Sequence, residues 1–420
     1  MARKPKVLVA MSGGVDSSVA AAMLQQQGYD VVGCFMRLGS PGESLDELVP
    51  AESCKPAKIG HQGCCSINDA ADARQVAAQL GIPLYVCNFK KDFGRIMDYF
   101  VDEYANGRTP NPCVRCNDWL KFGKLHDYAK QIGADFVASG HYARVEHAEE
   151  VLNAEAAENA EEISEEHLSV SGSWRPSRPL RSNQGSRLLR GLDHTKDQSY
   201  VLFGVPRDRL AEMLLPIGSM LKPAVRELAK QLNLPVFNKP DSQEICFIPD
   251  NDYAGFVERR RPELAAAGAI VDDSGAVVGE HQGQHRFTVG QRRGIPLSLG
   301  HRIYITARDA KTNTVRVGSR EDLASRTCTV GEANWLIDDR DILDGFPCLA
   351  MHRYNTRPVS ARVSRLPDSP VETHSGRRGR FQVQFDEPQN AVAPGQALVL
   401  YGLDDAVLGG GWIEAANSLG

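Results

Sequence analysis

Three cysteines in two distant segments are the residues best suited to covalent chemistry. Cys113 and Cys116 lie in GRTPNPCVRCN (107–117), and Cys246 lies in DSQEICFI (241–248). Two prolines give the first segment an extended approach to a predicted helix. The positive end of a helix dipole favours a thiolate, and Cys116 is expected close to the helix start. Ten cysteines among 420 residues do not form a disulfide scaffold, so these thiols suit nucleophilic catalysis or metal binding.

A second segment whose residues could take part in chemistry, SGGVDSS, occupies residues 12–18. Its glycines allow a tight turn in which successive N–H groups and a helix N-terminus face an anion. A P-loop NTPase requires a lysine followed by Ser or Thr, and this segment has neither a lysine nor that pair. Because an aspartate repels phosphate, we expect Mg²⁺ between Asp16 and a bound nucleotide.

The elements around these segments predict a doubly wound α/β domain. Short runs that are apolar throughout are typical of strands buried on both faces of a parallel sheet, and they occur at 7–10, 31–35, 84–88 and 136–139. Helical spacing, each time closed by a glycine, occurs at 17–27, 67–80 and 120–132. In such a fold, ligands bind at the carboxyl ends of the strands.

Three domains are expected: an α/β domain over 1–209, a small central domain over 210–280, and a β-barrel over 281–420. Period-two segments such as 302–307, 314–317 and 382–385 favour the barrel. The α/β domain carries a polar loop at 39–63, expected to act as a lid, and an acidic insertion at 146–187, expected to be disordered.

Charge does not exclude a nucleic-acid partner. The net charge is −5, but nine glutamates lie between 146 and 167, and the rest of the chain has 48 basic and 44 acidic residues. No apolar run approaches the ~18 residues of a membrane span, and no secretory cleavage site follows the start. We expect a monomeric, cytoplasmic protein without membrane contact.

The remaining cysteines receive structural interpretations. Four fall in strand patterns and are expected in the core: Cys34, Cys87, Cys328 and Cys348. Three more, Cys54, Cys64 and Cys65, lie in or beside the polar loop, where a regulatory thiol or a metal site is an alternative to a plain loop.

Several motifs in a fixed order carry a family resemblance. SGGVDSS resembles the pyrophosphate loop of the N-type ATP pyrophosphatases. Together with it, six further motifs are similar to those of the tRNA-specific 2-thiouridylase family. They are NPCVRCN, SGHY (139–142), LLRGLDHTKDQSYVL (188–202), DSQEICFI, PGQ (394–396) and GGGWI (409–413). The resemblance implies that ATP adenylates O2 of the wobble uridine and that sulfur then replaces this oxygen, giving 2-thiouridine, AMP and pyrophosphate.

The resemblance also implies catalytic roles. Cys246 would carry a persulfide, and Cys116 would attack it, releasing sulfur or closing a disulfide. Many members have Asp where this chain has Cys113, so an iron–sulfur cluster held by Cys113, Cys116 and Cys246 is an alternative, and zinc a weaker one. A cysteine desulfurase or a sulfur-relay protein would supply sulfur. Rival interpretations are a small-molecule adenylating synthetase and a non-catalytic tRNA-binding protein.

Binding residues follow from the same resemblance. The implied ATP contacts are Ala10, Met11, Ser12, Gly13, Gly14, Val15, Asp16, Ser17, Met36 and Gly140. The implied tRNA contacts are Asn111, Pro112, His141, Lys196, Asp197, Gln198, Arg353, Tyr354 and Gln396, with Asn111 to Cys113 at the target base.

Overall fold

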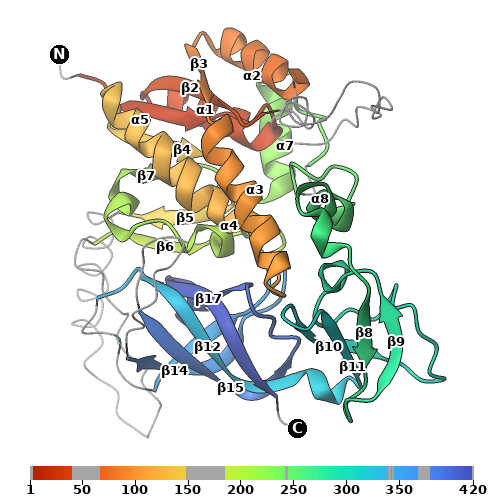
Figure 1. Ribbon diagram of the computed structural model, residues 1–420. Coiled ribbons are helices and arrows are strands. Elements are labelled where there is room, and N and C mark those ends of the chain that lie inside the picture. Colours follow the sequence, from red (N-terminus) through yellow and green to blue (C-terminus); the bar gives the residue numbers. More distant parts are fainter. Residues whose placement is uncertain are drawn as a thin grey trace, which may run out of the picture.

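The structure is a computed structural model that describes residues 3–39, 67–147, 185–241, 245–338, 342, 345–367 and 379–418. Several predicted features lie outside these residues. They are most of the expected lid, the acidic insertion beyond its ends, and Cys54, Cys64 and Cys65. Figure 1 shows an α/β layer at one end, a β-barrel at the other, and a small sheet beside the barrel. Within the described part of the chain, no helix has the length and apolar character needed to cross a bilayer.

A parallel sheet with the order β3-β2-β1-β4-β7 forms the core of the first layer, which confirms the predicted α/β class. Its strands are β1 (Lys6–Ala10), β2 (Asp30–Arg37), β3 (Leu84–Asn88), β4 (Phe136–Ser139) and β7 (Met213–Leu214). Four of them were predicted. The two-residue β7 was not, because it is too short to show a pattern. A separate hairpin joins β5 (Ala143–Glu146) to β6 (Arg187–Arg190).

Helices cover both faces of this sheet because successive residues of a strand point to opposite sides. Val7 and Val9 pack in one cluster with α1, α2 and α7, whereas Leu8 and Ala10 pack in another with α3, η2 and α5. The helices are α1 (Val15–Gln26), α2 (Ile67–Leu80), α3 (Lys90–Ala105), α5 (Leu125–Gln131), α7 (Lys222–Gln231), the π-helix η2 (Cys116–Lys124), and the 3₁₀ turns η3 (Ser199–Leu202) and η4 (Arg207–Glu212).

A continuous helical run carries two of the candidate cysteines. It starts with α4 (Pro112–Arg115), continues as η2 and ends with α5. Proline suits the first helical position because no hydrogen bond is required of its nitrogen. The sequence placed the helix start close to Cys116, but the run begins at Pro112. Cys113 therefore lies in the first turn, and Cys116 lies one turn further along.

Two β-structures follow the first layer. A four-stranded sheet, ordered β10-β11-β8-β9, lies beside α8 (Tyr253–Arg260), and a closed barrel has the order β12-β15-β14-β13-β16-β17. Strands of the sheet are β8 (Gly268–Val271), β9 (Val277–His281), β10 (Tyr304–Asp309) and β11 (Thr314–Gly318). Strands of the barrel are β12 (Ala324–Trp335), β13 (Phe346–Met351), β14 (Val359–Leu366), β15 (Arg380–Asn390), β16 (Ala397–Tyr401) and β17 (Val407–Ser418).

The expected barrel is confirmed, but the segments 302–307 and 314–317 do not belong to it. They form β10 and β11 of the small sheet, because a period-two pattern identifies a strand without identifying its neighbour. The expected boundaries at 209/210 and 280/281 stay predictions. Strand pairing places β7 in the first sheet.

Arg115 joins the first layer to the barrel. Its guanidinium is 1% exposed, and its Cζ lies 3.9 Å from the ring centre of Trp412 in β17 and 5.0 Å from that of Tyr99 in α3. Its Nη2 lies 2.9 Å from the Glu332 carboxylate in β12. A buried charge requires such a partner, so removing Glu332 would leave an uncompensated cation in the interface.

Buried histidines lead to a prediction about pH. Burial lowers the pKa of His126, His141, His281, His285 and His352 below the ordinary value of 6.5. The unfolded chain therefore binds more protons than the folded one as the pH falls through 6.5, and acid destabilises the fold. We expect the urea midpoint to fall between pH 7.5 and 5.5, with each histidine contributing at most about 1.4 kcal/mol per pH unit.

Substitutions separate this effect from general acid sensitivity. His281→Asn should flatten the dependence of the urea midpoint on pH. His301→Gln, at an exposed position, should leave it unchanged. A midpoint that stays constant or rises as the pH falls would contradict the prediction.

Candidate functional site

One pocket of about 710 Å³ lies at the carboxyl ends of β1, β2 and β4, where a doubly wound sheet is expected to bind its ligand. Most of the predicted site residues line it. They are Ala10, Met11, Ser12, Gly14, Val15, Asp16, Ser17, Met36, Asn111, Pro112, Cys113, Cys116, Gly140, His141, Lys196, Gln198, Cys246 and Tyr354. Segments far apart in the chain therefore meet around one cavity.

The turn between β1 and α1 has the geometry of an anion site. Gly13 has a φ of +74°, and a Cβ there would lie 2.2 Å from the carbonyl oxygen of Asp69, so only glycine fits. Gly140 allows similarly close packing, because a Cβ there would lie 2.5 Å from the backbone nitrogen of Ser17. The first turn of α1 thus borders the pocket with its N-terminal N–H groups.

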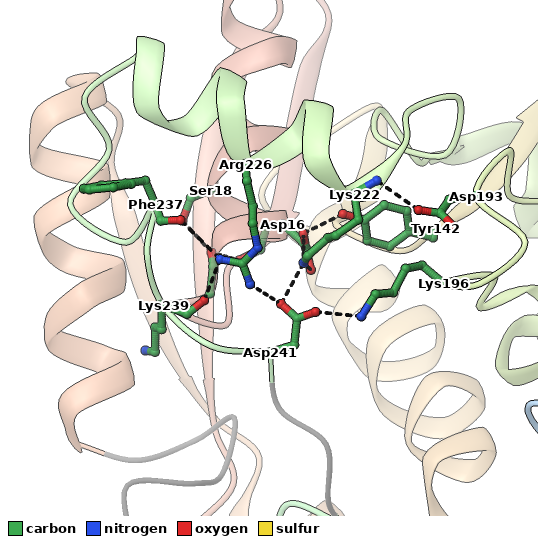
Figure 2. A network of polar contacts seen from close by, with 12 residues as sticks. Asp16, Ser18, Tyr142, Asp193, Lys196, Lys222, Arg226, Phe237, Lys239 and Asp241 are labelled. Carbon is green, nitrogen blue, oxygen red and sulfur yellow. Dashed lines mark hydrogen bonds and ion pairs between the residues drawn. The ribbon is translucent and has the colours of Figure 1, made fainter.

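Two lysines from later segments line the pocket beside SGGVDSS, which has no lysine of its own, and Figure 2 shows one of them, Lys222, between Asp16 and Asp241. The Nζ of Lys222, at the start of α7, lies 2.7 Å from Asp16 Oδ1 and 2.8 Å from Asp241 Oδ1. The Nζ of Lys239 donates to the carbonyl of Gly13 at 3.0 Å and to the carboxylates of Asp69 at 2.6 Å and Asp72 at 2.5 Å. Sequence reasoning missed both lysines. The signal available was weak: Lys222 precedes a helical proline, and Lys239 opens the segment that leads to Cys246.

Asp241 is the shared anion of this network. Its carboxylate accepts from Lys196 at 2.9 Å and from Arg226 at 2.8 Å, in addition to Lys222. Burial alone would raise the pKa of Asp241, but hydrogen bonds from Lys222 and Lys196 outweigh burial and hold this pKa at about 2. Asp241 therefore stays charged at physiological pH.

Asp16 is also engaged within the protein. It accepts from the hydroxyl of Tyr142 at 2.8 Å as well as from Lys222. Mg²⁺ usually takes one or two carboxylates together with substrate phosphates. In the present arrangement Asp16 faces a cation and a hydroxyl. The magnesium site stays a prediction.

The candidate thiols lie on two walls of the pocket. Cys113 is exposed, whereas Cys116 and Cys246 are half-buried. Phe247, next to Cys246, packs edge-on against Phe93 and Phe100 of α3, with ring centres 5.6 and 5.4 Å apart. These aromatic contacts fix the Cys246 segment beside the helical layer that also carries the other two cysteines.

The three cysteines do not form a cluster site in this structure. Across the ranges that the structure describes, no group of three His, Cys, Asp or Glu side chains is placed to hold a metal ion. The iron–sulfur cluster of Cys113, Cys116 and Cys246 and the zinc alternative stay predictions.

His141 is a neutral member of the site. It is 6% exposed, with Nδ1 2.7 Å from the hydroxyl of Ser139 and Nε2 3.4 Å from Nζ of Lys121. Burial, and then the charge of Lys121, hold the pKa of His141 well below 6.5. It can therefore donate or accept a hydrogen bond but does not add a positive charge.

Four predicted site residues do not line the pocket: Gly13, Asp197, Arg353 and Gln396. Asp197 is 9% exposed and accepts from Arg190 at 2.8 Å and from the backbone nitrogens of Gly191 and Ser199 at 3.0 Å. It stabilises a turn, which does not favour a direct contact to tRNA. Gln396 donates to backbone carbonyls before Cys113. Arg353 is exposed beside Tyr354, whose ring centre lies 5.6 Å from that of Tyr200.

The strand cysteines have structural contacts. Cys34, Cys328 and Cys348 are buried, as predicted. Cys87 is only half-buried, and its sulfur lies 3.1 Å from that of Cys34 on the neighbouring strand. Neither Cys34 nor Cys87 lines the pocket.

Family models match nearly the whole chain. Residues 5–250 match a model described as tRNA methyl transferase HUP domain, residues 254–319 one described as tRNA methyl transferase PRC-barrel domain, and residues 325–413 one described as Aminomethyltransferase beta-barrel domain. These three matches follow the α/β layer, the small sheet and the barrel.

Curated relatives are similar over their full length. A protein from Rhodopirellula baltica is 41% identical over 98% of this chain and 96% of its own, and one from Carboxydothermus hydrogenoformans is 42% identical over 98% of both chains. A third, from Geobacter metallireducens, is 41% identical over 100% of this chain and 99% of its own. All three are named tRNA-specific 2-thiouridylase MnmA. The chain therefore belongs to the tRNA-specific 2-thiouridylase family.

Proposed function

We propose that this protein is a tRNA-uridine 2-sulfurtransferase that uses ATP to exchange the O2 of a wobble uridine for sulfur. The observation that carries the proposal is the meeting of an anion-binding turn, two lysines and candidate thiols in one pocket. A carbonyl oxygen is a poor leaving group, so the reaction requires both activation and a sulfur nucleophile. The pocket brings together the residue types for both steps.

In the activation step, O2 of the uridine attacks the α-phosphorus of ATP and pyrophosphate leaves. The turn at residues 12–18, with Lys222 and Lys239, would hold the phosphates and stabilise their charge. Mg²⁺ would accompany the ATP and add further positive charge. Met36 and Gly140 would border the nucleoside part.

In the sulfur step, the terminal sulfur of a persulfide on Cys246 attacks C2 of the adenylated base, and AMP leaves. Cys116 then attacks Sγ of Cys246. The bond between this Sγ and the sulfur on C2 of the base breaks, and 2-thiouridine is released. A disulfide between Cys116 and Cys246 remains, and a thiol reductant must reduce it before the next round. The sulfur step itself uses no metal.

The partners follow from the same chemistry. We propose that tRNA is the substrate, that a cysteine desulfurase or a sulfur-relay protein loads Cys246, and that the enzyme works as a monomer in the cytoplasm. The exposed Arg353 and Tyr354 beside the pocket suit a phosphate contact and base stacking, respectively.

A nucleoside assay tests the proposal. Unmodified tRNA transcript, ATP and a persulfide donor should yield 2-thiouridine by mass spectrometry together with AMP. A methylated nucleoside instead, as the descriptions of the first two family models suggest, would point to methyl transfer. Absence of AMP with every donor tried would overturn the proposal.

Serine substitutions test the two catalytic thiols. Cys116→Ser and Cys246→Ser should each lower thiolation by at least about 100-fold, because a hydroxyl neither carries nor accepts the sulfur. Equilibrium binding of tRNA should change by less than about 2-fold. Cys87→Ser, outside the pocket, is the matched control and should keep full activity. Undiminished thiolation in either catalytic variant would remove that residue from the mechanism.

Cys113→Asp separates the persulfide scheme from a cluster. It introduces the residue that many family members carry, so we expect thiolation to persist at a comparable rate. Loss of thiolation together with loss of bound iron from anaerobically purified protein would instead support a cluster.

Substitution of Lys222 tests the anion site. Lys222→Met should weaken the binding of a non-hydrolysable ATP analogue by about 10- to 100-fold, the effect of removing a charge-assisted hydrogen bond. Lys239→Met should act in the same direction. Lys230→Met, on an exposed turn of the same helix α7, is the control and should bind normally. Normal analogue binding by both pocket variants, measured on protein that is folded by circular dichroism, would place the phosphates elsewhere.

A further inference from the structure

Four lysines of the described chain line the pocket, and three of them are paired with carboxylates of the protein. Lys222 and Lys196 share Asp241, and Lys222 also contacts Asp16. Lys239 donates to two aspartates of α2. The charges of these three lysines are therefore compensated before any ligand binds.

The fourth lysine, Lys121, differs from the other three. Among the residues that the structure describes, no carboxylate forms an ion pair with its Nζ, which instead lies 3.4 Å from Nε2 of His141. Burial and the charge of Lys121 hold the pKa of His141 well below 6.5, so this imidazole is neutral and can accept a hydrogen bond from the ammonium. His141 therefore orients the ammonium of Lys121 without cancelling its charge.

Lys121 connects the two chemical parts of the pocket. It follows Cys116 by five residues in the π-helix η2, whose hydrogen bonds also span five residues, so the two residues lie one turn apart and both line the pocket. On the other side, its contact His141 follows Gly140, which packs closely against the backbone of Ser17 in the first turn of α1. The ammonium thus lies where the helix of the thiols meets the anion-binding turn.

We propose that Lys121 is a catalytic residue that binds the α-phosphate, first in ATP and then in the adenylated uridine. This inference rests on the function proposed above. O2 of the base bonds to the α-phosphorus as the bond to pyrophosphate breaks, and AMP later leaves with this oxygen and its electron pair. Lys121 donates a hydrogen bond to the α-phosphate throughout and transfers no proton.

Two arguments favour the α-phosphate over the other phosphates. It is the phosphate bonded to the base, so it must lie between the nucleotide and the sulfur that attacks C2. Negative charge also changes there in both steps. A lysine without a carboxylate partner among the described residues can stabilise this charge without first breaking an ion pair.

AMP and adenosine test the assignment without tRNA or sulfur, because AMP carries the α-phosphate alone. Lys121→Met should lower the affinity for AMP by about 10- to 100-fold, the effect of removing a charge-assisted hydrogen bond. Its affinity for adenosine should stay within about 2-fold. Lys121→Gln, which keeps a donor without the charge, should act in the same direction and serves if Lys121→Met does not fold by urea denaturation. Lys124→Met, at an exposed position of η2 outside the pocket, is the matched control and should bind both ligands normally.

Pyrophosphate release tests the catalytic role. In a single turnover at saturating ATP and tRNA, Lys121→Met should release pyrophosphate at least about 100-fold more slowly than wild type. Its dissociation constant for tRNA should stay within about 2-fold.

Three results would overturn the inference. One is normal AMP affinity in both Lys121 variants. Another is normal pyrophosphate release with weakened tRNA binding, which would assign Lys121 to a phosphate of the RNA. The third is normal pyrophosphate release with slow thiolation, which would assign it to the thiols. Wild-type protein that releases no pyrophosphate with tRNA would contradict the proposed function, whereas the comparison of AMP with adenosine would still decide whether Lys121 binds the α-phosphate.

Discussion

The buried charge of Lys222 constrains the whole site. Its ammonium is compensated by Asp16 from the first helix and by Asp241 from the segment leading to Cys246. A lysine with little access to water requires such partners, so three segments that are remote in sequence must converge at one point. The cation that an anion-binding turn needs is thereby supplied from outside the turn. The same contacts place the Cys246 segment beside that turn, which brings the sulfur chemistry to the nucleotide chemistry.

A second convergence holds the other thiols. Arg115 is enclosed by aromatic rings and paired with Glu332, while Gln396 fixes the carbonyls before Cys113. A fully buried guanidinium between domains leaves little freedom for the helix that contains it. The barrel is consequently part of the framework of the pocket, although it lies apart from the sheet that forms the pocket floor (Figure 1).

Local signals in the sequence predicted the parts of this arrangement that are local. Four of the five strands of the first sheet and the turn at SGGVDSS were predicted correctly, because apolar runs and glycine turns depend on neighbouring residues. The role of Lys222 was not predicted, since its pair with Asp16 spans 206 positions. The segments 302–307 and 314–317 were assigned to the wrong sheet for a related reason: alternation reveals one face of a strand and not its partner. Asp197 and Gln396 were assigned to tRNA by resemblance alone, and their hydrogen bonds within the protein require a structure to be seen.

The two supports of the site differ in physical character, and this difference follows from exposure. Around Asp241, the partner Lys196 has a side chain that is 39% exposed, and Asp241 itself is 25% exposed, so salt screens this network. Arg115 is 1% exposed and is held by rings as well as by charge, so salt has little access to it. Such a partly screened network suits a site where phosphates compete with Asp241 for the same lysines, because a lysine can exchange its aspartate partner for a phosphate at a small cost in free energy. Contacts that exclude water suit residues 109–115, because Cys113 must keep its position relative to the base while the charges beside it change.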